Sequence, residues 1–415
     1  MKTNPGTVAF YRATTLQLIS SVLVGALPDM VTFTHSGDVV LAANEGEPNT
    51  SYTTDPEGSV SIIDVKNINR PTVRTASFSA FNGQAAQLRA SGVRIFGPNA
   101  SVAQDFEPEY VAVSENDRTA FVTLQENNAL AIVDIAGAVV TSIIPLGTKN
   151  HSLAGNGLDA SDRDGPPPNI RTWPVLGLYL PDGIDAYSVN GQTYLVTANE
   201  GDAREYLDPP GFVEEARVNS LPLNPNVFTD AICGGTCADN TRLGRLTVTS
   251  TLGLNAATNQ YDALYVLGAR SFTIWTAAGQ RVWDSRDDFE QRTTSLALAN
   301  FNASNNNNSF DDRSDNKGPE PEGVVLGRLG SKTFAFYGRR RRSRTRRTDV
   351  RARTPVDEQE SAVDRGQRGQ RNDRGIPDPP PLTPRHARHQ LHITATSYGS
   401  NFRSAVTMVR PSARA

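Results

Sequence analysis

Carboxylates that follow short apolar strands are the residues of this sequence most able to do chemistry. Glu45 and Glu200 stand in two copies of an Asn-Glu-Gly motif, and Glu126 has the same place in a third copy that reads Gln-Glu-Asn. If the three strands belong to equivalent units around one axis, these carboxylates converge. Converging carboxylates bind a cation or have a raised pKa. The alternative is that each Glu accepts backbone N–H groups in the turn of its own unit.

Three more residues complete this candidate pocket. Asp202 and Arg204 follow Glu200 directly, and Arg270 lies in the later run GARSF. A guanidinium can pair with a carboxylate or hold a phosphate through two parallel hydrogen bonds. The candidate pocket therefore comprises Glu45, Glu126, Glu200, Asp202, Arg204 and Arg270. For Arg270, the alternative is a structural salt bridge.

Two acidic loops offer ligands for Ca²⁺, because this cation takes several oxygen ligands from a turn. The candidate metal ligands are Asp159, Asp162 and Asp164 in the first loop and Asp311, Asp312 and Asp315 in the second. Neither loop has the spacing of an EF-hand. The alternative is that these carboxylates are solvated turn residues. Ca²⁺ is the one cofactor for which the sequence offers candidate ligands.

Motifs for nucleophilic catalysis are absent from the sequence. It contains no G-x-S-x-G elbow, no P-loop and no H-E-x-x-H motif. His151, in the run TKNHSLAGN, could be a ligand or a general acid–base, but a lone His in a loop is more often neither. The sequence therefore names no catalytic residue.

The two cysteines, Cys233 and Cys237, lie close together in ICGGTC. A structural zinc site needs about four ligands, and no second cysteine pair or nearby histidine cluster supplies the others. We expect a small disulfide, with two free thiols as the alternative.

The elements that must position these residues are repeated β-hairpins. Copies begin at Pro28, Pro108, Pro181 and Pro321. Each copy reads proline, an acidic residue, an apolar strand, a polar turn and a second apolar strand, which is typical of a hairpin. Self-similar hairpins predict propeller blades or a solenoid, and the run 264–285 supplies strands for one more unit. No 12-residue stretch has a sustained helical period. The sequence predicts an all-β, incomplete β-propeller with long polar loops outside the core at 156–170 and 301–323.

The charge of the chain changes at about residue 338. The 415 residues have a net charge of −3, but residues 338–415 contain 18 arginines, no lysine and seven acidic residues. An Arg-rich tail that begins inside a hairpin is what a shifted reading frame in GC-rich DNA produces. We expect residues 1–337 to form a partial propeller domain and 338–415 a disordered Arg/Pro-rich tail. A nucleic-acid-binding arm is the alternative, but the tail has few aromatic residues, and no nucleic-acid partner is expected.

Several motifs together resemble the choice-of-anchor I domain family. They are LAANEGEP, DPEGSVSIIDV, TANEGDAREY, GARSFTIW and DDRSDNKGPEPEG, and the resemblance covers about residues 7–337. The family includes relatives of a mesenchyme-specific cell-surface glycoprotein and proteins labelled as atypical alkaline phosphatases. The resemblance implies a β-propeller of exported or surface-anchored bacterial proteins, although residues 1–30 lack the features of a signal peptide. It also implies that this chain is truncated at both ends.

Two functions follow as expectations. The first is an extracellular or cell-surface binding and scaffold module for an unknown surface or extracellular ligand. It would contact a membrane only through an anchor that is absent from this chain. The alternative is a metal-dependent phosphoesterase, in which a dication held by Asp and Glu would polarise phosphoryl oxygens and activate water. Three or more carboxylates converging with an arginine would favour the phosphoesterase, and acids scattered on outer loops would favour the binding module.

Overall fold

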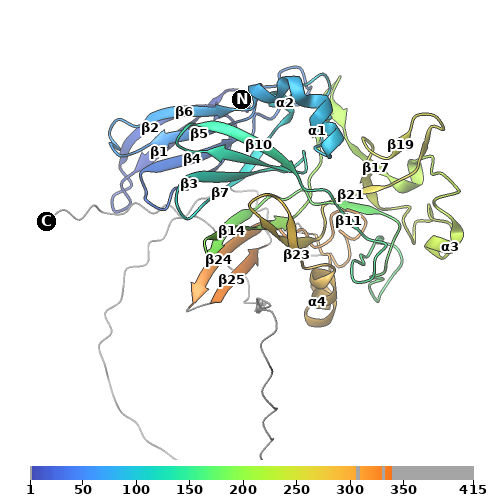
Figure 1. Cartoon of the computed structure of the whole chain (residues 1–415). Helices are drawn as coiled ribbons and strands as arrows, with labels where there is room; N and C mark the ends of the chain where they lie inside the picture. The colour runs from blue at the N-terminus through green and yellow to red at the C-terminus, as the bar shows by residue number, and fades with distance from the viewer. Residues whose placement is uncertain (1, 305–308, 330–331, 339–415) are drawn as a thin grey trace, which may run out of the picture.

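The structure is a computed structural model that describes residues 2–304, 309–329 and 332–338. Strands dominate these residues, and the longest helix, α4 (Asp288–Leu296), has only nine residues (Figure 1). The prediction of an all-β fold is therefore confirmed. The disordered tail predicted for 338–415 lies, beyond Gly338, outside the described residues, so the division at that point stays a prediction.

Three four-stranded antiparallel sheets in the described part of the chain have the form of propeller blades. The first blade contains β3 (Pro28–Phe33), β4 (Val39–Asn44), β5 (Ser59–Asp64) and β6 (Thr72–Ser77). The second contains β7 (Pro108–Val113), β8 (Thr119–Leu124), β9 (Ala129–Asp134) and β10 (Val139–Pro145). The third contains β13 (Ile184–Val189), β14 (Gln192–Asn199), β22 (Ser271–Thr276) and β23 (Arg281–Asp284). The predicted proline repeats thus open the blades, since the first two begin at a repeat proline and the third just after one.

The third blade corrects one expectation. Residues 264–285 were expected to form a unit of their own, but strand β22 pairs with β14. In this antiparallel register Tyr194 lies opposite Thr276, and Asn199 lies opposite Ser271. The two halves of this blade are separated by an insertion. Three strands of the insertion join two strands that precede this blade in a five-stranded sheet. Its order is β11 (Thr148–Asn150), β12 (Leu176–Leu178), β21 (Tyr265–Leu267), β18 (Thr247–Thr249) and β17 (Glu215–Arg217). Strands β12 and β21 run parallel.

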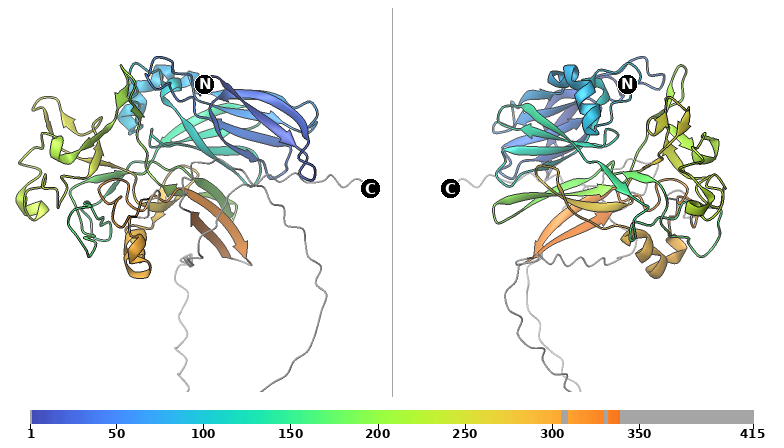
Figure 2. Two further views of the ribbon diagram at one scale, coloured as in Figure 1. Left: turned by 180° about the vertical axis from the view of Figure 1, so that it is seen from behind. Right: turned by 45° about the vertical axis from the view of Figure 1, so that its right-hand side comes forward.

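Two hairpins lie at the ends of the blade series. β1 (Pro5–Tyr11) pairs with β2 (Leu18–Ala26), and β24 (Gly323–Leu329) pairs with β25 (Lys332–Gly338). β2 contacts the first blade, β3 and β4 contact β7, β7 contacts β13, and β24 contacts β13 and β14. The sheets therefore follow one another in sequence order. Figure 2 shows this open arrangement, with the blue and the orange hairpin at separate ends. Among the described residues no closed ring is formed.

The remaining elements are short. The small hairpins are β15 (Glu205–Tyr206) with β16 (Phe212–Val213), and β19 (Leu254–Asn255) with β20 (Gln260–Tyr261). The other helices are η1 (Ser79–Gln84), α1 (Ala85–Ser91), α2 (Val102–Asp105), η2 (Val218–Ser220), α3 (Asp230–Cys233) and η3 (Leu298–Asn300). In the residues that the structure describes, none of the helices has the length and apolar character needed to span a membrane.

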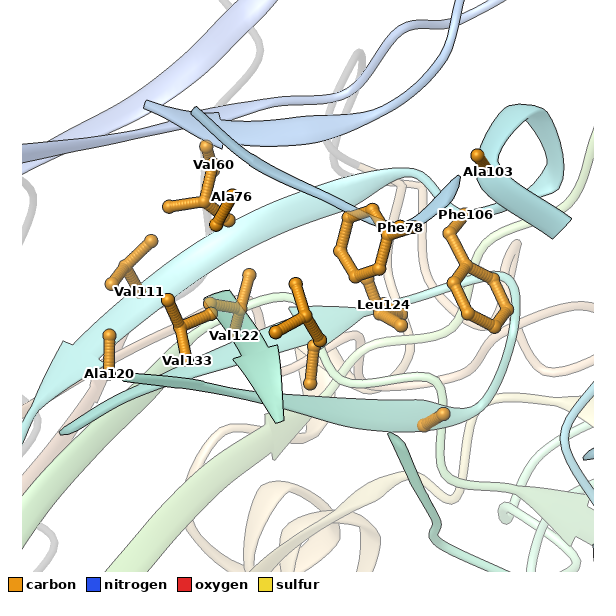
Figure 3. Packing of buried hydrophobic residues seen from close by; sticks show 14 of the residues in the cluster. Val60, Ala76, Phe78, Ala103, Phe106, Val111, Ala120, Val122, Leu124 and Val133 are labelled. Atoms are coloured by element: carbon orange, nitrogen blue, oxygen red, sulfur yellow. The ribbon is translucent and has the colours of Figure 1, made fainter. Parts of the chain in front are cut away.

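The largest apolar core lies between the first two blades. Figure 3 shows Val60 and Ala76 of the first blade facing Val122 and Val133 of the second. Strands β4 and β8 are buried along almost their whole length, which explains why their sequences are apolar with little alternation. Face-to-face burial of this kind is the main stabilising contribution to the blade pair.

The two long polar loops correct a second expectation. They contain no regular strand or helix along most of their length, as predicted, yet Leu158, Ala160 and Phe301 are almost fully buried. Buried backbone needs hydrogen-bond partners. Arg270 supplies them, since its guanidinium donates to the carbonyl oxygens of Asp159 and Ser314, one in each loop.

Candidate functional site

Each blade brings two acidic positions to the same end of its first hairpin. The acid after the repeat proline lies at the start of the first strand, and the acid of the Asn-Glu or Gln-Glu motif follows the second strand. The antiparallel register pairs Pro28 with Asn44 and Pro108 with Leu124. The hairpin geometry therefore places the two acidic positions of one blade side by side.

The Asn-Glu-Gly motif has a local structural cause. Asn44 and Asn199 are buried at the ends of β4 and β14, and each side-chain amide donates to two hydroxyl groups on the third strand of its blade. The glycines that follow, Gly46 and Gly201, have φ angles of 72° and 91°, which glycine adopts without steric cost. The asparagine fixes the strand end, and the glycine turns the chain directly after the glutamate.

These positions form what we call the central carboxylate cluster, which consists of Asp29, Glu45, Glu107, Glu109, Glu126, Glu200 and Asp202. Carboxylate oxygens of Asp29, Glu45 and Glu109 lie within 4.8 Å of one another. One contact crosses from the second blade to the third, where Gln125 Nε2 donates to Glu200 Oε2 at 3.2 Å. Glu126 in turn acts on Glu45 through its negative charge, and Asp202 acts on both Glu126 and Glu200.

Burial and mutual repulsion raise the pKa values in this cluster. Burial raises the pKa of Glu45 to about 9, and the negative charges of Asp29, Glu47 and Glu126 add to the effect. The pKa of Glu126 is raised well above its usual value, first by burial and then by Glu107 and Asp202. For Glu200, burial raises the pKa to about 7 although Lys317 opposes the change. The cluster therefore favours bound protons or a bound cation over bare negative charge.

Arg204 forms an ion pair with Glu107 of this cluster, and it is only 2% exposed. Its Nη2 donates to the backbone carbonyl of Asp105 at 2.6 Å and lies 3.1 Å from Glu107 Oε1. Its Nη1 lies 3.3 Å from Asp105 Oδ2, and the guanidinium stacks over the ring of Phe96. Arg204 is therefore held as a structural ion pair.

Two lysines form ion pairs at other carboxylates of this region. Lys2 Nζ lies 2.6 Å from Glu47, and Lys317 Nζ lies 3.1 Å from Asp202. Within the described ranges, no basic side chain forms an ion pair with Glu45, Glu109 or Glu126. These three carboxylates are consequently without a direct counter-charge from the part of the chain that the structure describes.

Arg270 does not join the central carboxylate cluster, contrary to the expectation from the sequence. It precedes β22 with a φ angle of 54°, and its guanidinium lies among the long loops. Besides the two carbonyl contacts given above, it donates to the carbonyl of Asn316 at 2.7 Å and to Glu290 Oε1 at 2.6 Å. Arg270 is therefore a structural link between the loops, which was the alternative that the sequence left open.

The predicted metal-binding loops meet in space, and we call their shared group the loop carboxylate cluster: Asp159, Asp164 and Asp311. Carboxylate oxygens of these residues lie within 4.8 Å of one another. Burial raises the pKa of Asp159 to about 8, with added repulsion from Asp164. Burial also raises the pKa of Asp311 to about 6, although a hydrogen bond from Ser314 opposes it. The sequence named all three ligands but treated the loops as separate clusters.

The other three predicted metal ligands lie outside this group. Asp162 accepts two hydrogen bonds of 2.9 Å from Arg245. Asp315 pairs with Arg217 and Arg245, each at 2.7 Å, and Asp312 is exposed. The first two carboxylates are therefore neutralised by arginines, and the third points to solvent.

Cys233 and Cys237 are joined by a disulfide bond. Both lie in an apolar cluster with Trp173, Phe228 and Leu243, so the bond supports the inserted region. His151 is fully buried, and its Nδ1 lies 2.6 Å from the carbonyl oxygen of Asn156. Neither the cysteine pair nor His151 offers an exposed reactive group.

Sequence reasoning missed several members of the central carboxylate cluster. Asp29 and Glu109 follow the repeat prolines directly, and Glu107 precedes one. The signal was present, because an acid recurs after each repeat proline. It was recognised as part of the repeat but not as part of the site, since the register that brings it beside the Asn-Glu motif is a property of the folded hairpin.

Comparisons with known proteins agree with the family resemblance seen in the sequence. A model of the choice-of-anchor I domain family matches residues 1–351. A mesenchyme-specific cell surface glycoprotein of Strongylocentrotus purpuratus is 27% identical over 305 residues, which is 64% of this chain and 39% of that protein. The chain thus spans well under half the length of this relative.

Two solved structures show weak similarity to the chain. The β-propeller domain of Cps50 (Swd1) from Myceliophteria thermophila has a TM-score of 0.28 and 11% identity, covering 47% of this chain and 44% of that one. The periplasmic gluconolactonase PpgL of Pseudomonas aeruginosa has a TM-score of 0.24 and 15% identity, covering 68% of this chain and 77% of that one.

Proposed function

This chain belongs to the choice-of-anchor I domain family, and we propose that it is an extracellular or cell-surface β-propeller module that binds a surface or extracellular ligand. The relative from Strongylocentrotus purpuratus is a cell surface glycoprotein, which supports this location. The chain spans 39% of that relative, so the proposal concerns a module and not the activity of a whole surface protein.

The observation that carries the proposal is the loop carboxylate cluster. Asp159 and Asp164 come from one polar loop, and Asp311 comes from another that is far away in the sequence. Loops held in a fixed arrangement on a rigid β-scaffold are the usual sites of binding. We propose that Ca²⁺ binds these three carboxylates and orders both loops, because Ca²⁺ takes six to eight oxygen ligands at about 2.3–2.6 Å.

The cation part of this proposal is tested with Asp164→Asn. A cation that binds only the native state raises the melting temperature by mass action. We expect millimolar Ca²⁺ to raise the melting temperature of the wild type and a chelator to lower it again, with a smaller rise in Asp164→Asn. The matched control is Asp312→Asn, on the same loop but exposed, which should keep the full rise. Equal rises in both variants would show that Ca²⁺ does not bind at the loop carboxylate cluster.

The location is tested on intact cells of the source organism. Antibodies against residues 1–337 should label unpermeabilised cells or the medium, and added protease should destroy the label on cells. A cytosolic control protein must survive the same treatment. Label that is found only after the cells are broken open would contradict the proposed location.

The convergence of carboxylates around Arg204 favours a second candidate function, a metal-dependent phosphoesterase. Such an enzyme needs a cationic group that is free to contact phosphoryl oxygens. Arg204 is not free for that role, because its guanidinium is already paired with Asp105 and Glu107. Hydrolysis of a generic phosphomonoester that is lost in Glu200→Ala or Asp202→Ala, and kept in the exposed control Glu115→Ala, would establish the enzyme. We expect no hydrolysis by the wild type.

A further inference from the structure

We propose that the central carboxylate cluster is a second cation site, in which Asp29, Glu45 and Glu109 bind one hard divalent cation of the Ca²⁺ type between the first and second blades. This site is separate from the loop carboxylate cluster and shares no residue with it. Its existence does not depend on the proposed function, and each site can be removed by its own substitution.

The first argument is the spacing of the oxygen atoms. Ca²⁺ binds oxygen at about 2.3–2.6 Å, so two ligand atoms on opposite sides of one ion are about 5 Å apart. Oxygens of Asp29, Glu45 and Glu109 lie within 4.8 Å of one another. One ion can therefore contact all three carboxylates.

The second argument is the balance of charge. The neighbouring cations are already paired: Lys2 with Glu47, Arg204 with Asp105 and Glu107, and Lys317 with Asp202. None of the described basic side chains is paired with Glu45, Glu109 or Glu126. A divalent cation would supply the positive charge that no described side chain brings into direct contact with these carboxylates.

The third argument is an independent one and comes from Glu126. This residue is only 6% exposed, and its Oε2 has no hydrogen-bond partner among the described residues. Its negative charge acts on both Glu45 and Glu109, so its carboxylate lies near this group. A buried carboxylate oxygen without a partner is costly, and a nearby cation removes that cost.

A group of close carboxylates can also be neutralised by protons instead of a cation. Protons and a metal ion compete for the same carboxylate oxygens. The alternative occupant is therefore protons alone, and the experiment must separate the two.

A cation at this position would link two blades. Asp29 belongs to β3 and Glu45 follows β4 in the first blade, whereas Glu109 belongs to β7 in the second. Strands β3 and β7 contact each other. The ion would bind both blades and so hold together the interface between the first and second blades, whose apolar part is drawn in Figure 3.

The experiment titrates the full chain with CaCl₂ alone, after a chelator has removed bound metal. Calorimetry is done in an Asp164→Asn background, in which the loop carboxylate cluster is disabled. We expect one remaining binding event, and the added substitution Glu109→Gln should weaken it at least about tenfold, as the loss of metal-site partners typically does. The matched control is Glu115→Gln, an exposed glutamate in the turn after β7, which should leave the affinity unchanged.

A melting experiment separates a cation ligand from a merely structural residue. This experiment is also done in the Asp164→Asn background. Without Ca²⁺, Glu109→Gln removes repulsion and should raise the melting temperature, whereas with Ca²⁺ it should lose most of the remaining Ca²⁺-induced rise. A structural residue would not give these opposite effects. Should Glu109→Gln fail to fold, Glu45→Gln serves instead, and in the otherwise wild-type chain it should lower the number of bound Ca²⁺ ions from two to one.

Three results would overturn the inference. The first is the absence of Ca²⁺ binding in the Asp164→Asn background at millimolar concentration, which would assign only protons to the central carboxylate cluster. The second is unchanged Ca²⁺ affinity after Glu109→Gln. The third is a Ca²⁺-induced rise in melting temperature that Glu109→Gln leaves intact. Loss of the loop site alone leaves the inference standing and contradicts only the Ca²⁺ part of the proposed function.

Discussion

The guanidinium of Arg204 lies 3.1 Å from the carboxylate of Glu107, and each residue is only 2% exposed. Glu107 precedes the second blade, and Arg204 follows the last strand of the first half of the third blade. Burial raises the pKa of Glu107 to about 8 although Arg204 opposes the change. The pair thus joins two distant segments in an environment where neither charge is stable alone.

Replacement of Arg204 by methionine should be strongly destabilising. It leaves Asp105 and Glu107 buried without their counter-charge, and breaking a buried ion pair from one side costs about 3–5 kcal/mol. Urea unfolding measures this loss. The control is Arg292→Met, which breaks the exposed pair with Asp288 and should change the unfolding free energy by at most about 0.5 kcal/mol. Similar losses in both variants would contradict this account.

The disulfide between Cys233 and Cys237 should stabilise the inserted region modestly. It closes a loop of about five residues, for which the chain-entropy model gives about 2 kcal/mol. We expect a reducing agent to lower the melting temperature of the wild type. The double variant Cys233→Ala, Cys237→Ala should melt at the temperature of the reduced wild type and should not respond to the reductant. A wild type insensitive to complete reduction would show that the bond adds no stability.

His151 should make the protein sensitive to mild acid. Burial, together with the positive charges of Lys149 and Arg270, lowers its pKa well below 6.5, while the carbonyl of Asn156 acts in the opposite direction. The unfolded state therefore binds the proton first, so the contribution to stability is complete above pH 6.5 and is lost as the pH falls. In His151→Gln, the unfolding free energy should fall less between pH 7 and pH 5 than in the wild type. Equal slopes would assign the acid sensitivity to other groups.

Gly58, in the link that enters β5, should not tolerate a methyl group. A Cβ atom there would lie 1.9 Å from the carbonyl oxygen of Phe106 and 2.7 Å from Pro108 Cδ, so Gly58→Ala must push the two blades apart. Overpacking of this kind costs about 1–3 kcal/mol or more. The control is Gly83→Ala, where a Cβ meets nothing within 4 Å and a gain of about 0.4–1 kcal/mol is expected. Chemical denaturation of both variants checks the opposite signs.

The local elements of the fold could be predicted from the amino-acid sequence alone. Hairpins at Pro28 and Pro108 could be predicted because alternating apolar runs and polar turns are short-range features. The Asn-Glu-Gly motif could be singled out for the same reason, since the buried asparagine and the left-handed glycine act within one blade. The resemblance to the choice-of-anchor I domain family was also readable from ordered motifs, and the match of residues 1–351 confirms it.

The contacts between residues far apart in the chain could not be predicted and became visible in the folded protein. Nothing local to Asn199 shows that its strand pairs with the strand beginning at Ser271, so the sequence placed Arg270 in the wrong group. For the same reason, the sequence did not predict that Asp164 and Asp311 share one cluster or that Glu109 lies close to Glu45. Pairing across an insertion depends on how whole sheets pack and satisfy buried polar groups, a balance summed over many residues that no short window of sequence contains.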